Sequence, residues 1–368
     1  MDQSQILDIL KTIQYPGFSR DIVSFGMIEN IRIEEKSLTL TLKLSTQQEG
    51  KKKEVVALVK EKLESTGEFD SIAIEHVEGA PSGPQPAGQI PEALPGVKHI
   101  LAVASGKGGV GKSTIATNLA CALKNQGHSV GLLDLDIYGP SLPIILGIAD
   151  QPKTTAERKL IPIDFHGMKV MSFGFISGNE TPTIWRGPLV ARMTEQFFRD
   201  VEWGTLDYLV LDLPPGTGDV QLTLTQKLKI SGAVIITTPQ DIALSDVRKG
   251  ADMFKKVQTP VLGVIENMSG LQIKGNIEGD SSSVTIEGHP IDVDESGNFS
   301  FKINLFKTGG GKQESDRLEV PLLAEIPLVQ ELMETTDQGK PITLSDPESD
   351  LSRIFADVAQ TVDKQLQG

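Results

Sequence analysis

The sequence predicts an α/β fold in which helices cover both faces of a mostly parallel sheet, preceded by a small α+β domain. Residues 106–114 read Gly-Lys-Gly-Gly-Val-Gly-Lys-Ser-Thr and follow an apolar run at 100–104. This is the phosphate-binding pattern G-x-x-x-x-G-K-[ST] in its strand–loop–helix context. Further apolar runs alternate with helix-compatible stretches, as in parallel sheets covered on both faces. A stretch rich in Pro and Gly at 80–96 separates this region from the smaller one and predicts a linker. Together these features are typical of a P-loop NTPase.

The small domain occupies residues 1–79. Its apolar residues follow a helical period first and then alternate as in strands, with a polar turn that predicts a β-hairpin. The order of elements is αββαβ, which is typical of a small α+β domain. We expect a helix at 6–13, strands at 27–33 and 38–44, a helix at 55–63 and a strand at 71–77.

The large domain occupies residues 97–368. Its apolar runs predict six strands, at 100–104, 129–135, 168–173, 208–213, 233–237 and 261–266. Helical patterns lie between them, among others at 190–199, 220–228 and 244–257. The last residues form an amphipathic helix whose apolar face begins at Leu351 and ends at Leu366. Because this helix carries only two basic residues, we expect it to dock on the core and not on a membrane.

Between about 270 and 311 the pattern changes to two strand-like runs, at 284–286 and 299–306, with turn residues before the second. These runs predict a β-hairpin inserted into the large domain.

Charge and cysteine content limit the classes of partner. The chain of 368 residues has a formal net charge of −14, which argues against binding nucleic acid or anionic membranes. No apolar run is long enough to span a bilayer, and the first residues lack the form of a signal peptide. The single cysteine, Cys121, excludes an intrachain disulfide, so we expect a cytoplasmic protein in which this thiol is a buried structural residue.

The phosphate-binding loop carries the most specific chemistry. Backbone N–H groups from its glycines and Val110 line a concave anion site at a helix N-terminus. Lys112 is expected to reach the β- and γ-phosphates, and the Ser113 hydroxyl to ligate Mg²⁺. A second lysine, Lys107, has two interpretations: a charge that crosses to a partner's triphosphate, or a solvated loop residue. The residues expected to contact the nucleotide here are Gly106, Lys107, Gly108, Gly109, Val110, Gly111, Lys112, Ser113 and Thr114.

Carboxylates stand at the ends of two apolar strands, where ligands bind in open α/β sheets. Asp134 and Asp136 end the strand at 129–135, and a carboxylate there, Asp136 above all, is a candidate to position the attacking water, either directly or through Mg²⁺. Asp212 ends the next long apolar run, in the manner of a Walker B aspartate that holds Mg²⁺ through water. Gly216 follows, where a backbone N–H is able to meet the γ-phosphate and move once that phosphate leaves. Asp219 is more simply a helix cap.

Five motifs in order resemble those of the Mrp/ApbC ATPases, relatives of MinD, ParA and the nitrogenase iron protein. They are K-G-G-V-G-K-S-T, D-I-Y-G-P-S, W-R-G-P at 185–188, D-L-P-P-G-T-G-D at 212–219 and E-N-M-S at 266–269. The small domain resembles the SufT/PaaD type through residues 20–28. The resemblance implies a homodimeric, Mg²⁺-dependent ATPase that carries iron–sulfur clusters to client apoproteins. It also implies that Lys107 acts across the dimer, that Asp136 positions water and that Asn267 binds adenine.

The chain departs from this family at one motif. Mrp proteins commonly follow E-N-M-S with a C-x-x-C pair that binds a bridging cluster, whereas residues 270–274 here read Gly-Leu-Gln-Ile-Lys. The small domain has Ser-Thr-Gln-Gln at 45–48 where a reactive cysteine often stands. Because clusters are usually held by cysteine thiolates, the residues predict the ATPase, and the resemblance alone predicts the cluster.

Two other functions are compatible with the same loop. One is a MinD- or ParA-like switch whose output is ATP-gated binding of a partner without cluster cargo. The other is a phosphotransferase of the dethiobiotin-synthetase type. The Pro214-Pro215-Gly216 sequence and Lys107 favour a hydrolytic switch over a kinase.

Overall fold

The structure is a computed structural model. The chain folds into two compact units, residues 1–89 and 90–368. The structure describes residues 3–10, 12–13, 22, 28–34, 37–44, 49–78, 94–137, 139–157, 159–177, 194, 196–216, 221, 224–225, 228–278, 284–286 and 289–367.

The first unit has the predicted αββαβ order. Strands β1 and β2 pair as an antiparallel hairpin, and β3 lies parallel to β2. Leu38, Leu40 and Leu42 of β2 alternate with polar residues and are buried against apolar residues of both helices. The elements are α1 (Gln3–Leu10), β1 (Ile28–Glu34), β2 (Ser37–Leu44), α2 (Glu49–Glu64) and β3 (Ser71–Glu78).

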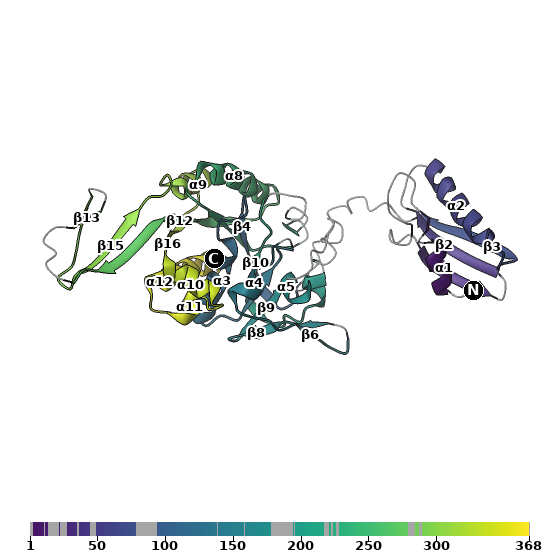
Figure 1. The fold of residues 1–368 in the computed structure, drawn as a ribbon, viewed down its shortest axis with the longest axis horizontal. Coiled ribbons are helices and arrows are strands. Elements are labelled where there is room, and N and C mark those ends of the chain that lie inside the picture. Colours follow the sequence, from purple (N-terminus) through teal and green to yellow (C-terminus); the bar gives the residue numbers. More distant parts are fainter. Residues whose placement is uncertain are drawn as a thin grey trace. The chain divides into compact units, whose positions relative to one another are not determined.

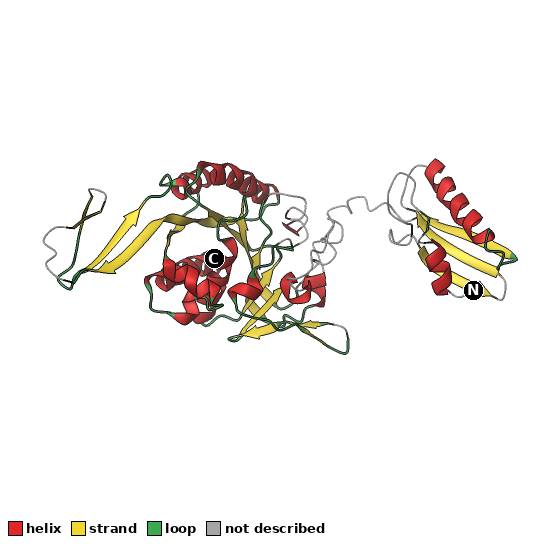
Figure 2. Cartoon of the chain, viewed as in Figure 1, coloured by secondary structure: helices red, strands yellow, loops and turns green. Residues whose placement is uncertain are grey.

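The second unit is built on a nine-stranded sheet (Figures 1 and 2). Strands β12, β11, β4, β10, β5 and β9 lie in that order and are parallel, as the six apolar runs predict. Strand β16 is parallel to β12, whereas β8 and β15 are antiparallel to their neighbours. The strands of this sheet are β4 (Val97–Ser105), β5 (Val130–Asp134), β8 (Ile163–Phe165), β9 (Met168–Ser172), β10 (Leu206–Asp212), β11 (Gly232–Thr237), β12 (Val261–Asn276), β15 (Asn298–Ile303) and β16 (Leu322–Leu328).

Helices cover both faces of the sheet, which confirms the predicted fold class. Figure 1 shows α8 and α9 together on one side, and α3, α10, α11 and α12 on the other. The helices of this unit are α3 (Lys112–Asn125), α4 (Leu142–Ile145), α5 (Phe173–Ser177), α8 (Asp241–Lys256), α9 (Gly310–Leu318), α10 (Gln330–Asp337), α11 (Ile342–Ser345) and α12 (Asp350–Gln367). Two short strand pairs complete it: β6 (Lys153–Thr154) with β7 (Leu160–Ile161), and β13 (Val284–Ile286) with β14 (His289–Ile291).

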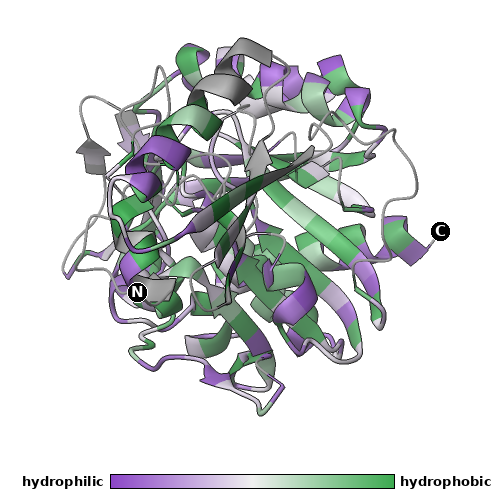
Figure 3. Cartoon of the chain, turned by 90° about the vertical axis from the view of Figure 1, so that its right-hand side faces the viewer, coloured by the Kyte–Doolittle hydropathy of each residue, from purple (hydrophilic) through white to green (hydrophobic). Residues whose placement is uncertain are grey.

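The sheet separates two hydrophobic cores, and β4 contributes to both. Leu101 and Val103 face the core of α3 and α12, while Ile100, Ala102 and Ala104 face the core of α8. Because successive side chains of a strand point to opposite faces, a fully apolar strand is needed at the centre of such a sheet. In Figure 3 the strands mostly have hydrophobic colours, whereas the helices are divided between hydrophobic and hydrophilic colours.

The predicted hairpin between 284–286 and 299–306 is wrong in its pairing. Strand β12 continues past residue 266 to Asn276, and its second half pairs with β15, while β13 pairs with β14. The second half of β12 (residues 271–276) and β15 form an arm. Where β12 passes from the core sheet into this arm, Met268 and Gly270 have positive φ angles of 57° and 82°, and the register with β16 shifts. Such a bulge redirects a strand without ending it, which apolar periodicity alone does not reveal.

The terminal helix α12 docks on the core as predicted. Leu351, Phe355, Val358 and Val362 are buried on the α3 side of the sheet. Across the part of the chain that the structure describes, no helix is long and apolar enough to cross a membrane.

Candidate functional site

The phosphate-binding loop lies at the carboxyl ends of three adjacent strands. It connects β4 to α3, and β10 and β5 end beside it at Asp212 and Asp134. The Leu135 N–H donates to the Asp212 carbonyl at 3.0 Å, and the Leu213 N–H donates to the Val103 carbonyl at 3.1 Å. The three strand ends are therefore fixed to one another directly below the loop.

Lys112 and Asp212 form a buried ion pair under this loop. The Lys112 ammonium contacts Asp212 Oδ1, and the two side chains are 6% and 0% exposed. The second carboxylate oxygen, Oδ2, is buried and has no hydrogen-bond partner among the described residues. Lys112 Nζ also lies 3.5 Å from the Ser113 hydroxyl. A cation, a carboxylate with an unused oxygen and a hydroxyl thus meet at the N-terminus of α3.

The same residues fit a Mg²⁺ ion of the kind that the fold class implies. Carboxylate and hydroxyl oxygens are the hard ligands that Mg²⁺ prefers, and the unused Asp212 Oδ2 is one of them. No group of three or more His, Cys, Asp or Glu is placed to hold a metal within the described ranges. This donor set suits an ion that takes most of its ligands from water and phosphate.

Asp134 is a fully buried carboxyl group next to this pair. Burial, together with the nearby charge of Asp212, raises the pKa of Asp134 to about 7. The Ser172 hydroxyl donates to Asp134 Oδ2 at 2.9 Å, and the Asp136 N–H donates to Oδ1 at 2.9 Å. Asp134 therefore fixes the backbone that carries Asp136.

Asp136 lies two residues beyond the end of β5 and is half-buried. One of its carboxylate oxygens accepts the Gly139 N–H at 3.3 Å. The structure places it in the loop that leaves the strand edge, where its sequence position predicts it.

Asn267 contacts the phosphate-binding loop directly. Its Nδ2 donates to the Val110 carbonyl at 2.8 Å, and its side chain is almost fully buried. Gly111 leaves room for this amide: a Cβ on Gly111 would lie 2.3 Å from Asn267 Nδ2. Gly111 also has a φ of 79°, in the left-handed region that favours glycine. Both features of this position require glycine.

Lys107 and Gly216 both connect the start of the loop to other segments. The Ser105 hydroxyl donates to the Lys107 carbonyl at 2.9 Å, and the Gly216 N–H donates to the Ser105 carbonyl at 3.0 Å. Lys107 Nζ donates to Gln240 Oε1 of its own chain at 3.2 Å. The structure thus brings Lys107, Lys112, Ser113, Asp136, Asp212, Gly216 and Asn267 to one edge of the sheet. The W-R-G-P motif at 185–188 and Asp219 lie outside the described residues.

With this geometry in place, comparison with known proteins identifies the family. The sequence model of the family described as NUBPL iron-transfer P-loop NTPase matches residues 96–283 and 294–363. The chain belongs to this family. A second model, described as iron-sulfur cluster assembly protein, matches residues 3–75.

Two curated members of the family are similar over nearly the whole chain, and a third over three quarters of it. An iron-sulfur cluster carrier protein from Haemophilus influenzae is 37% identical, covering 99% of this chain and 92% of that protein. A protein of the same description from Deinococcus radiodurans is 39% identical, covering 98% and 95%. An iron-sulfur cluster transfer protein NUBPL from Dictyostelium discoideum is 40% identical, covering 75% and 79%.

Solved structures agree on the fold of the second unit. A nucleotide-binding protein from Archaeoglobus fulgidus in complex with ADP is 34% identical, with a TM-score of 0.56, covering 72% of this chain and 95% of its own. MinD from Pyrococcus horikoshii, complexed with Mg-ADP, has a TM-score of 0.50 at 23% identity, covering 73% and 96%, and supports the fold alone.

The single cysteine of this NUBPL-family chain, Cys121, lies in the core on the α3 side of the sheet. It is fully buried in α3, and burial raises the pKa of its thiol to about 12. The thiolate that would bind iron is therefore strongly disfavoured. This agrees with the predicted structural role.

Three residues of the site were not predicted from the sequence. Ser172 donates to Asp134, Gln240 accepts from Lys107, and Glu266 accepts the Gly311 N–H at the start of α9. Glu266 ends the apolar run at 261–266, and Gln240 follows the one at 233–237. A polar residue at the end of an apolar run is the same sequence signal that identified Asp212. Ser172 has the same signal at the end of β9, but only the strand order shows that β9 lies beside β5.

Proposed function

We propose that this chain is a Mg²⁺-dependent ATPase that acts as a homodimer in the assembly of iron–sulfur clusters or their transfer to apoproteins. The observation that carries the proposal is the buried Lys112–Asp212 pair beneath a phosphate-binding loop. The names of the relatives, carrier and transfer proteins for iron–sulfur clusters, support the cargo. The ADP complex of the Archaeoglobus protein supports the nucleotide.

Each residue of the site has a role in this proposal. Lys112 exchanges Asp212 for the β- and γ-phosphates when ATP binds, and Ser113 and Asp212 then face the metal. Mg²⁺ supplies charge neutralisation to the phosphate oxygens. Asp136 positions the attacking water from the loop that Asp134 fixes. Asn267, already against the loop, faces adenine, and the Gly216 N–H exchanges Ser105 for the γ-phosphate.

Hydrolysis is assigned to the dimer because of Lys107. A second cation close to the triphosphate stabilises charge that develops as the γ-phosphoryl leaves. Lys112 serves the nucleotide of its own chain, and the resemblance to the Mrp/ApbC ATPases implies that Lys107 serves that of the partner.

The ATPase is tested by phosphate release and by sedimentation with and without ATP. Lys112→Ala should abolish nucleotide binding. Lys107→Ala should retain binding by isolated chains but impair both hydrolysis, to a low residual kcat, and ATP-dependent dimerisation. If Lys107→Ala hydrolyses ATP like the parent, the role across the dimer is wrong.

The cluster step is assigned to contact with a thiol-bearing partner. The only cysteine is buried with a raised pKa, so this chain offers no thiolate of its own. Anaerobic reconstitution of the chain alone should yield less than stoichiometric iron and acid-labile sulfide, in the parent and in Cys121→Ala alike. A stoichiometric cluster that disappears in Cys121→Ala would contradict this assignment and make Cys121 a ligand.

The buried cysteine also favours a second candidate, an ATP-gated interaction switch without cluster cargo. Cluster transfer between a loaded donor and an apoprotein distinguishes the two: ATP and this chain should accelerate it only in the first. For either candidate we propose a cytoplasmic site of action, with protein partners in preference to nucleic acid or membrane. The net charge of −14 and the absence of disulfide-forming cysteine pairs support this.

A further inference from the structure

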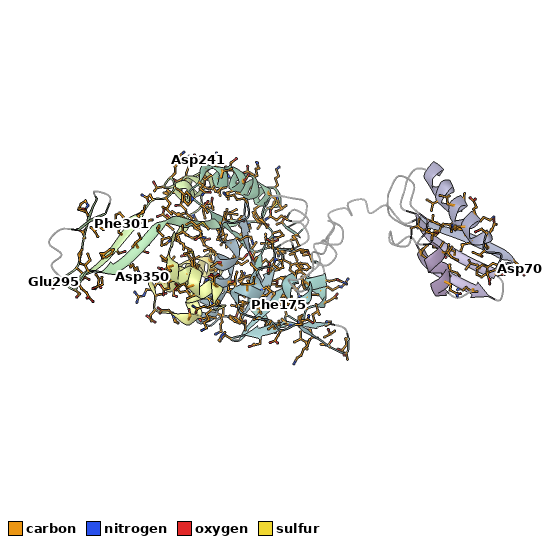
Figure 4. All side chains as sticks on the ribbon, in the orientation of Figure 1. Asp70, Phe175, Asp241, Glu295, Phe301 and Asp350 are labelled. Carbon is orange, nitrogen blue, oxygen red and sulfur yellow. The ribbon has the colours of Figure 1, made fainter. Side chains whose placement is uncertain are left out.

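Lys107 is held at a defined place within its own chain. Its Nζ donates to Gln240 Oε1 at 3.2 Å, and both side chains are half-buried. Gln240 lies 133 positions further along the chain, immediately before α8. Asp241, labelled in Figure 4, is the first residue of that helix and locates this end of α8.

The Gln240 side chain has no role in starting the helix. Gln240 is the N-cap residue of α8, with φ −71° and ψ 132°, and its side chain makes no cap hydrogen bond. The first hydrogen bond of the helix uses the Gln240 backbone carbonyl, which accepts the Ala243 N–H at 2.9 Å. N-cap positions favour Ser, Thr, Asp and Asn, whose short side chains reach the backbone. A glutamine here is a poor cap, and its amide instead accepts from Lys107.

The backbone segments that carry Lys107 and Gln240 pack against each other. A Cβ on Gly106 would lie 2.2 Å from the Asp246 carbonyl carbon, so the loop backbone packs directly on α8. Helix α8 is joined to α9 by the pairs Arg317–Asp252 at 3.2 Å and Arg248–Glu314 at 3.6 Å. With both backbones fixed, the flexible parts of the arrangement are the four-carbon stem of Lys107 and the shorter side chain of Gln240, which hold each other through one hydrogen bond.

We propose that Gln240 is a positioning residue for Lys107, which it orients toward the nucleotide of a second copy of the chain. An ammonium group has three donors, so one bond to Gln240 leaves two for phosphate oxygens. The amide is neutral and therefore orients the cation without cancelling its charge. A carboxylate would orient Lys107 equally well but would weaken its attraction to a triphosphate. This inference rests on the proposed role of Lys107 across the dimer.

The test is a set of Gln240 variants of the full chain, each made with Lys107 and with Lys107→Ala. Gln240→Leu removes the acceptor, and Gln240→Glu keeps the acceptor but adds a charge. Both should lower kcat roughly tenfold, about the effect of losing one hydrogen bond to a charged group. The KM for ATP should not change, because ATP binding uses Lys112 of the same chain. In the Lys107→Ala background neither variant should lower kcat further.

Gln313→Leu and Gln313→Glu provide matched controls. Gln313 lines a hollow of about 440 Å³ with Pro239 and Asp241, next to Gln240, whereas the hydrogen bond of Lys107 Nζ goes to Gln240. These controls should keep the parent kcat, and tryptophan fluorescence should show that every variant is folded.

Three results would overturn the inference. First, a parental kcat in Gln240→Leu would show that the contact with Gln240 does not orient Lys107. Dimerisation of Gln240→Leu at a lower ATP concentration would likewise show that the contact restrains Lys107. Equal losses in the Lys107→Ala background would show that Gln240 acts through the fold, while the proposed function stands. Parental kcat in Lys107→Ala itself would overturn the role of Lys107 across the dimer and this inference with it.

Discussion

Replacing Gly111 by alanine tests whether the contact between the phosphate-binding loop and Asn267 stabilises the fold. The substitution has two separable costs. The first is backbone strain at φ 79°, about 1–2 kcal/mol for a residue with a Cβ in the left-handed region. The second is steric, because the new Cβ would lie 2.3 Å from Asn267 Nδ2 and displace the amide from the Val110 carbonyl. Leaving these buried groups unpaired costs about 1–3 kcal/mol.

Gly109→Ala isolates the first cost. Gly109 lies in the same loop with a similar φ of 77°, but a Cβ there meets no atom within 4 Å. We therefore expect Gly109→Ala to lower the free energy of unfolding by about 1–2 kcal/mol and Gly111→Ala by about 2–5 kcal/mol. In the Asn267→Ala background the excess of Gly111→Ala should disappear, because no amide remains to be displaced.

The assay is urea denaturation followed by tryptophan fluorescence. Both tryptophans, Trp185 and Trp203, belong to the second unit, so the signal reports that unit and not the first. Trp203 is buried in the α8-side core and is sensitive to unfolding. Equal losses for Gly109→Ala and Gly111→Ala, or an excess that persists without the Asn267 amide, would refute the steric argument.

Three further predictions concern the Lys112–Asp212 ion pair, the buried carboxyl group of Asp134 and the Tyr208 hydroxyl. Lys112→Ala should lower the free energy of unfolding by about 3–5 kcal/mol by leaving Asp212 unpaired, and adding Asp212→Asn should restore most of it; no recovery in urea denaturation would contradict the pairing. The raised pKa of Asp134 means that the native state retains a proton that the unfolded chain loses, so stability should fall as pH rises from about 4 to about 7. Asp134→Asn should flatten this part of the profile of unfolding free energy against pH, and an unchanged slope would count against the assignment. Tyr208→Phe removes the hydroxyl that donates to Asp363 of α12 and should cost about 1 kcal/mol, seen as a lower urea midpoint; an unchanged midpoint would show that this bond does not stabilise the helix.

The sequence by itself determined many of the elements of this protein. Hydrophobic periodicity is a local property, so it located six of the seven parallel strands, the terminal helix and the αββαβ order of the first unit. The phosphate-binding loop was equally evident, because its glycines, Lys112 and Ser113 are contiguous and each is required by backbone geometry or phosphate chemistry.

Tertiary structure alone decided which of these elements meet. Ser172 and Asp134 are 38 positions apart, and their hydrogen bond depends on β9 lying beside β5. The contact between Lys107 and Gln240 depends in the same way on the packing of the loop against α8.

The arm shows the same limit at the level of strands. The segment from Glu266 to Gly270 contains polar residues and glycine, which normally end a strand, yet β12 continues through a bulge and pairs with β15. In Figure 4, Phe301 marks β15 on this arm and Asp350 marks the start of α12, where Lys274 of β12 forms an ion pair at 2.9 Å. The physical reason is the same in each case: periodicity records which side of an element is buried, whereas pairing depends on which distant segment covers it.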